Sequence, residues 1–151
     1  IKASNSGRRG MAAILARWNA RAAEKLEGWR WWRVLSAPRS HKFLMPPGEG
    51  GGLRASIWEP ANGDEPDGGS PMFELPDYAH DLNAVASLEA ILAKRGVIDA
   101  YLDALYLVVY GESLTAWDGH PSFAITANAA QRLEAVLRAC GLIADETVNA
   151  L

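Results

Sequence analysis

The sequence has only one cysteine, Cys140, among its 151 residues, and it lacks a long apolar run. One thiol cannot close a disulfide within the chain, so a disulfide-stabilised secreted scaffold is excluded and a reducing compartment is expected. The longest apolar run, ALYLVVY from Ala104 to Tyr110, is far shorter than the ~18–20 residues that cross a bilayer. We therefore expect a cytoplasmic protein that has no membrane partner.

Motifs that carry chemistry are also missing. His41, His80 and His120 are far apart, and no pair has the spacing of a metal site. The glycines of Gly48–Gly52 are not followed by the Lys-Ser/Thr that completes a phosphate-binding loop. The acidic loop Asn62–Gly69 contains a proline that breaks the ligand spacing of a calcium loop. The sequence therefore predicts no cofactor, no metal site and no enzymatic activity.

One polar cluster nevertheless joins an imidazole to two carboxylates: Asp77, His80 and Asp81, within PDYAHD. Such groups act as general acids and bases when a pocket brings them together, as in a small hydrolase or metal enzyme. The alternative is a helix start, in which Asp81 accepts backbone N–H groups and its charge complements the helix dipole. We favour the helix start, because it needs no pocket.

Charge is unevenly distributed along the chain. Residues 1–54 carry eleven Lys or Arg against three Glu, a net charge of +8, whereas residues 55–151 carry four against fifteen acids, a net charge of −11. Such asymmetry marks a contact with nucleic acid or with an acidic protein, unless the two halves lie together and neutralise each other. We favour neutralisation.

The stretch EGWRWWRVL, Glu27–Leu35, places three tryptophans and two arginines within five residues. Trp and Val favour strands, and in a strand Trp29 and Trp31 would face a core while Arg30 and Trp32 would be half exposed. Burial of the tryptophans in the core is the favoured interpretation. The alternative is a functional surface, since aromatic and basic side chains together suit the stacking of nucleic-acid bases. That candidate binding surface comprises Arg30, Trp32, Arg33, Arg39 and Lys42.

Helical and strand patterns follow one another along the chain. Apolar residues at helical spacing predict helices over Ala12–Glu27, Leu82–Lys94 and Ile98–Val109, and a last helix that follows Asn128. LYLVVY alone would also suit a buried strand, but the longer pattern favours a helix. Strands are predicted over Trp29–Leu35, His41–Met45 and Arg54–Glu59, as a small antiparallel meander, and over Ser122–Thr126.

This order of elements predicts an α+β fold, a single domain in which helices cover a small antiparallel sheet as an α/β/α layered sandwich. We expect the domain to cover residues 11–144, with a mobile loop over residues 60–74 and a C-terminal tail over residues 145–151. Residues 1–10 are polar and precede Met11, where the helical pattern begins, so we expect them to lie upstream of the domain.

Four segments carry a further pattern: AEKLEGWRWWR, FLMPPG, LPDYAHDLNAVASLEAIL and ITANAAQRLEAVLRA, at Ala23–Arg33, Phe43–Gly48, Leu75–Leu92 and Ile125–Ala139. In this order they resemble the phage ABA sandwich domain family of small phage and prophage proteins. The chain departs from the family pattern at His80 and Asp81, where small hydroxyl residues are usual, and at Ala129, where proline is common. The resemblance implies an α/β/α layered domain of phage origin, and it brings no catalytic residues.

The expected function is that of a phage- or prophage-encoded accessory protein that binds a host or phage protein without catalysis. The first alternative is a nucleic-acid-binding protein that uses the basic and aromatic segment 29–42. That alternative requires the side chains of this segment to converge on one basic face. A small hydrolase or metal enzyme around His80 is the remaining alternative.

Overall fold

The chain contains both helices and strands, as the sequence predicts. The computed structural model describes residues 2–34, 42–48, 58–61, 70–71, 75–111 and 122–143. Within these residues lie five helices and four strands, so the predicted α+β class is confirmed. The elements are α1 (Lys2–Leu26), β1 (Arg30–Val34), β2 (Lys42–Met45), β3 (Trp58–Pro60), β4 (Ser70–Pro71), α2 (Leu82–Arg95), α3 (Ile98–Tyr110), α4 (Ser122–Thr126) and α5 (Ala129–Ala139). No described helix is long and apolar enough to cross a membrane.

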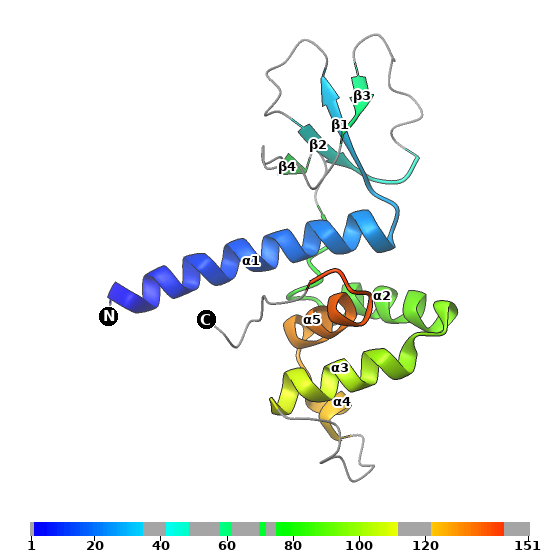
Figure 1. The fold of residues 1–151 in the computed structure, drawn as a ribbon. Helices are drawn as coiled ribbons and strands as arrows, with labels where there is room; N and C mark the ends of the chain where they lie inside the picture. The colour runs from blue at the N-terminus through cyan, green and yellow to red at the C-terminus, as the bar shows by residue number, and fades with distance from the viewer. Residues whose placement is uncertain are drawn as a thin grey trace. The chain divides into compact units, whose positions relative to one another are not determined.

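The chain forms two compact units. One comprises Ile1–Asn19 together with Asp77–Leu151, and the other comprises Ala20–Pro76. The first holds α2 to α5, whereas the second holds the four strands and the last two turns of α1 (Figure 1). The expected α/β/α sandwich, in which helices cover the sheet, depends on the placement of the two units relative to each other, so it stays a prediction.

The helical unit has an apolar core. Helix α5 packs against α2 and α3, and the short α4 packs against α3 (Figure 1). In α5, Leu133, Val136 and Leu137 are fully buried, while Cys140, the C-cap of the helix, is half-buried. The other fully buried large side chains include Trp18, Tyr78, Val85, Leu88, Leu92 and Leu105.

Local signals determine most of the helix ends. The side chain of Asp81 accepts the backbone N–H of Asn83 at 2.9 Å, which confirms it as the N-cap of α2. Asn128 caps α5, and the side chain of Gln131 accepts the backbone N–H of Asn128 to complete a capping box. Gly111, with φ of 70°, ends α3, so the ambiguous segment is a helix as predicted.

Helix α1 is longer than predicted at its N-terminal end. It begins at Lys2 rather than at Ala12, so residues 2–10 continue the helix instead of lying outside it. Once a helix has formed, adding residues at its end costs much less than nucleating a new one, and no proline interrupts this segment. At the other end the prediction is confirmed, because Gly28 has φ of +81° and the N–H of Trp29 bonds to the Ala23 carbonyl at 3.0 Å.

The sheet has the order β3-β1-β2-β4, which differs from the predicted meander. Strand β1 lies between β2 and β3 and is antiparallel to both, so β3 pairs with β1 instead of β2. Strand β4 pairs in parallel with β2 and lies within the segment that was predicted to be loop. The long connections between these short strands leave strand order to tertiary contacts. Residues 62–69 and 72–74 of the predicted loop lie outside the described residues.

The predicted strand over Ser122–Thr126 is wrong, because this segment forms the helix α4. Its β-branched and aromatic residues favour strands in isolation. In the structure, however, the Arg132 guanidinium of α5 donates to the Ala124 carbonyl and, from Nε, to the Ala127 carbonyl at 3.0 Å. These contacts satisfy carbonyl groups at the end of α4, which a five-residue helix could not satisfy alone.

Candidate functional site

Strand β1 lies inside the sheet, and its alternating side chains define two faces. The register pairs Trp32 with Phe43 of β2 and with Pro60 of β3, and it pairs Val34 with Trp58. Directly paired residues share a face. One face, here called the outward face, therefore carries Arg30, Trp32, Phe43, Met45, Trp58 and Pro60; Met45, the cross-strand partner of Arg30, is buried.

The outward face is apolar but partly open. Trp32, Phe43 and Trp58 are half-buried, while Arg30 and Pro60 are exposed. The Cζ atom of Arg30 lies 5.5 Å from the ring centroid of Trp32, within cation–π range. The rings of Phe43 and Trp58 meet edge to face, with centroids 5.9 Å apart. These contacts restrict the rotamers of the four side chains.

The opposite face of the sheet contains the tryptophan that the sequence assigns to the core. Trp31 is buried, and its indole Nε1 donates to Glu24 Oε2 of α1 at 3.1 Å. Its cross-strand partner Leu44 is fully buried. Trp29, which precedes β1, is also buried, so the predicted core role of Trp29 and Trp31 is confirmed.

The five residues of the candidate binding surface do not share one face. Arg33 and Lys42 are cross-strand partners on the Trp31 side of the sheet. Lys42 is only 2% exposed, with Nζ 5.2 Å from the Trp31 ring centroid, and Arg33 lies 3.8 Å from the Glu59 carboxylate. Arg39 lies outside the described residues. Of the predicted residues, Arg30 and Trp32 therefore remain together on the outward face.

Sequence reasoning missed Phe43 and Trp58 as neighbours of Trp32. Both lie in segments that were predicted as strands, but a strand pattern does not reveal which residues of different strands face each other. The pairing of β1 with both β2 and β3 brings them together. The available signal was the recurrence of a large aromatic residue in each of the three strand segments.

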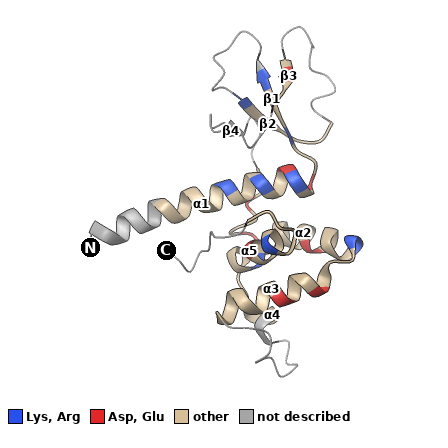
Figure 2. Cartoon of the chain, in the orientation of Figure 1, with Lys and Arg blue, Asp and Glu red and all other residues tan. Residues whose placement is uncertain are grey.

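The charge asymmetry of the sequence does not persist in the folded units. The sheet unit, Ala20–Pro76, contains seven Lys or Arg and eight acids, a net charge of −1. The helical unit contains eight Lys or Arg and ten acids, a net charge of −2, because the basic start of the chain joins the acidic C-terminal half. Figure 2 shows basic residues along α1 and acidic residues on α3. Neither unit has the large positive charge typical of a nucleic-acid-binding domain.

The cluster of Asp77, His80 and Asp81 lies at the start of α2. His80 Nδ1 lies 3.0 Å from Asp77 Oδ1, and Asn19 Nδ2 of α1 donates to the same oxygen at 3.2 Å. The Asn19 side-chain oxygen accepts the backbone N–H of Ala79 at 3.1 Å. The side chains of His80 and Asp77 are 67% and 55% exposed, so they line no buried pocket. These contacts fasten α1 to the start of α2, in agreement with the helix-start interpretation.

Asp77 carries a pH-dependent prediction. Partial burial acts to raise the pKa of Asp77, but hydrogen bonds from His80 and Asn19, together with the charge of His80, outweigh it and lower the pKa. A carboxyl whose pKa is lower in the folded state stabilises the fold above its unfolded pKa of about 3.9, and this contribution is lost as pH falls through the folded pKa. We therefore expect Asp77→Asn to be less stable than wild type at pH 7, with the difference shrinking below about pH 4.

Urea unfolding of both proteins between pH 7 and pH 3 measures this difference. Asp103→Asn is the matched control, because Asp103 is an exposed acid of α3. Its substitution should leave the pH dependence of stability close to that of wild type. A stability difference between wild type and Asp77→Asn that stayed constant over this pH range would contradict the prediction.

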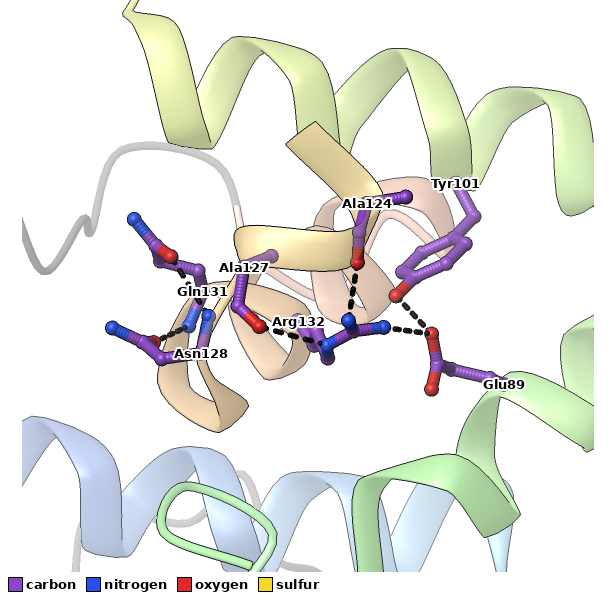
Figure 3. A network of polar contacts seen from close by, with 7 residues as sticks. All are labelled: Glu89, Tyr101, Ala124, Ala127, Asn128, Gln131 and Arg132. Carbon is purple, nitrogen blue, oxygen red and sulfur yellow. Dashed lines mark hydrogen bonds and ion pairs between the residues drawn. The ribbon is translucent and has the colours of Figure 1, made fainter. Parts of the chain in front are cut away.

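The structure also contains a polar network that the sequence did not indicate (Figure 3). Arg132 of α5 donates from Nη1 to Glu89 Oε2 of α2 at 3.2 Å, and the Tyr101 hydroxyl of α3 donates to the same oxygen. With the two carbonyl groups that it binds at the end of α4, Arg132 joins α2, α4 and α5. Figure 3 shows Glu89 and the carbonyl groups of Ala124 and Ala127 around the Arg132 guanidinium, with Tyr101 hydrogen-bonded to Glu89.

Two titratable groups of the helical unit, Tyr101 and Cys140, have raised pKa values. Burial, and then the hydrogen bond and the charge of Glu89, raise the pKa of Tyr101 far above its usual value, so the hydroxyl stays protonated. Burial also raises the pKa of the Cys140 thiol, which disfavours the reactive thiolate. Within the described part of the chain, no three His, Cys, Asp or Glu residues are grouped so that they could hold a metal ion.

Comparison with protein-family models, with curated proteins and with solved structures finds no match for this chain. The resemblance to the phage ABA sandwich domain family therefore rests on the four sequence segments.

Proposed function

We propose that the protein is a non-catalytic binding module and that the outward face of the sheet contacts a partner protein. The observation that carries the proposal is the pairing of Arg30 with Trp32 beside the edge-to-face pair of Phe43 and Trp58. These side chains are partly open to solvent, although burying their apolar area would be favourable. A partner that covers them gains that free energy.

The residue types on this face suit a protein contact. Tryptophan and arginine are enriched among the residues whose truncation costs most binding energy at protein interfaces. The contacts between the four side chains reduce the ordering that binding requires, since their rotamers are already constrained. Pro60 adds a rigid apolar group beside Trp32.

The distribution of charge favours a protein over a nucleic acid. Nucleic-acid affinity comes largely from several cations that contact phosphates along a strand. Two of the described cations predicted for this role, Arg33 and Lys42, lie on the opposite face of the sheet from Trp32. The sheet unit as a whole carries a net charge of −1.

The resemblance to the phage ABA sandwich domain family supports the biological part of the proposal. On this basis the protein is encoded by a phage or prophage and acts in the host cytoplasm, where it binds a host or phage protein. The sequence has no catalytic motif, which supports a non-catalytic role.

Trp32→Ala is expected to weaken partner binding by at least about 30-fold, because truncating a central interface tryptophan costs about 2 kcal/mol or more. Wild type and variant are immobilised on a support at equal density and incubated with bacterial lysate. The proteins that each retains are then quantified by mass spectrometry. Leu107→Ala is the matched control, since Leu107 is an exposed apolar residue of α3 in the helical unit. Thermal unfolding of each variant confirms that the fold is retained.

The proposal predicts that one or more proteins are retained by wild type and by Leu107→Ala, and that Trp32→Ala loses them. Retention that is equal for all three proteins would contradict it. Anisotropy titration of labelled single- and double-stranded DNA and RNA at two salt concentrations tests the nucleic-acid alternative. Tight binding that weakens steeply with salt and is lost in Trp32→Ala would replace the proposed function with nucleic-acid binding.

A further inference from the structure

Building on the proposed function, we propose that the outward face binds an extended acidic segment of the partner protein. In this arrangement a carboxylate of the segment pairs with Arg30, and an apolar side chain two residues away covers Trp32 and its neighbours.

Arg30 supplies the charge that selects an acid. Its side chain is exposed, and among the described residues no carboxylate pairs with it. Glu59, the acid of strand β3, lies on the opposite face beside Arg33. A guanidinium remains charged at all relevant pH values, and its fork of N–H donors matches a carboxylate. Contact with Trp32 restricts the side chain while its N–H donors remain available.

The apolar part of the face is a platform that crosses three strands. Phe43, Trp32 and Pro60 lie side by side in register on β2, β1 and β3. Neighbouring strands are about 4.8 Å apart, so this row is about 10 Å wide. Trp58 widens it through its edge-to-face contact with Phe43. A platform of this size accommodates one large side chain, such as leucine, proline or an aromatic residue.

The spacing between charge and platform favours an extended segment. Arg30 and Trp32 are two residues apart on one strand, which corresponds to about 6.7 Å along β1. An extended peptide places residues i and i+2 on the same side at a similar distance. The matching motif is therefore an acidic residue, any residue, and then a large apolar residue, in either chain direction.

A peptide library displayed on particles tests this inference with the full-length protein as bait. The library consists of random 12-residue peptides selected on wild type, on Arg30→Gln and on Trp32→Phe. We expect wild type to enrich peptides with Asp or Glu two residues from a large apolar residue. Synthetic peptides with this motif should bind at least about tenfold more tightly than versions with Gln or Asn at the acidic position, as expected for loss of a charged hydrogen bond.

The variants separate the two contacts. Arg30→Gln should bind the acidic and the amide peptides with equal affinity. Trp32→Phe should bind both peptides more weakly than wild type does but should still prefer the acidic one. Enriched peptides that lack acids but still depend on Trp32 would overturn the inference and leave the proposed function intact. Failure to enrich any peptide would also overturn it, while the lysate measurement would still decide the proposed function. Salt-sensitive binding of labelled single-stranded RNA or DNA that needs Arg30 would overturn both.

Discussion

Replacing Trp18 with alanine is expected to lower the free energy of unfolding by about 3–5 kcal/mol. Trp18 is 1% exposed and lies on the part of α1 that belongs to the helical unit. Truncating a buried aromatic residue removes the transfer free energy of the ring and leaves a cavity that the neighbours fill only in part. Urea unfolding followed by circular dichroism measures the change.

Trp32→Ala is the matched control for this experiment, since it removes the same side chain from a half-buried position. Its stability cost should be clearly smaller, because a half-buried ring loses less transfer free energy and leaves no closed cavity. The two substitutions are therefore expected to have opposite profiles: Trp18→Ala mainly affects stability, and Trp32→Ala mainly affects partner binding. Equal stability losses would show that Trp32 belongs to the core and would argue against a binding role for the outward face.

Arg132→Ala is expected to destabilise the helical unit by about 2–4 kcal/mol. The guanidinium binds Glu89 and two backbone carbonyls, and the side chains of Arg132 and Glu89 are only 18% and 24% exposed. Its removal leaves the Glu89 carboxylate with the hydrogen bond from the Tyr101 hydroxyl and deprives the end of α4 of a donor. The expected loss is largest for α4, and amide hydrogen exchange of α4 and α5 should detect it.

Two further substitutions separate the contributions of Arg132. Arg132→Lys keeps the charge opposite Glu89 but cannot bind both carbonyl groups. Its free energy of unfolding should therefore fall between those of wild type and Arg132→Ala. Gln131→Ala removes half of the capping box from the neighbouring position and should cost about 1 kcal/mol or less. An Arg132→Ala protein no less stable than Gln131→Ala would show that the network contributes little.

The helix boundaries that the sequence predicts well are those determined by local chemistry. Asp81 and Asn128 act as N-caps because their side chains bond to backbone N–H groups within three residues. Gly96 and Gly111 end α2 and α3 because their positive φ values suit a residue that lacks a Cβ atom. Each of these signals involves neighbours in the sequence, so no tertiary information is needed to detect it.

The errors arise where distant residues decide the local structure. Ser122–Thr126 has the composition of a strand, but Arg132 binds its carbonyl groups and the segment is helical. Ser70–Pro71 has the composition of a loop, but it pairs with β2. In both cases a contact with a separate element outweighs a weak intrinsic preference.

The sequence by itself determined the α+β class, the core roles of Trp29 and Trp31, and the caps of α2 and α5. Periodicity and capping act over a few residues, so a single sequence contains them. Only the tertiary structure decided that β1 lies between β2 and β3, and therefore that Trp32, Phe43 and Trp58 share one face while Arg33 and Lys42 lie on the other. Strand order and register depend on which distant segments pair, because backbone hydrogen bonds between strands are nearly independent of residue type.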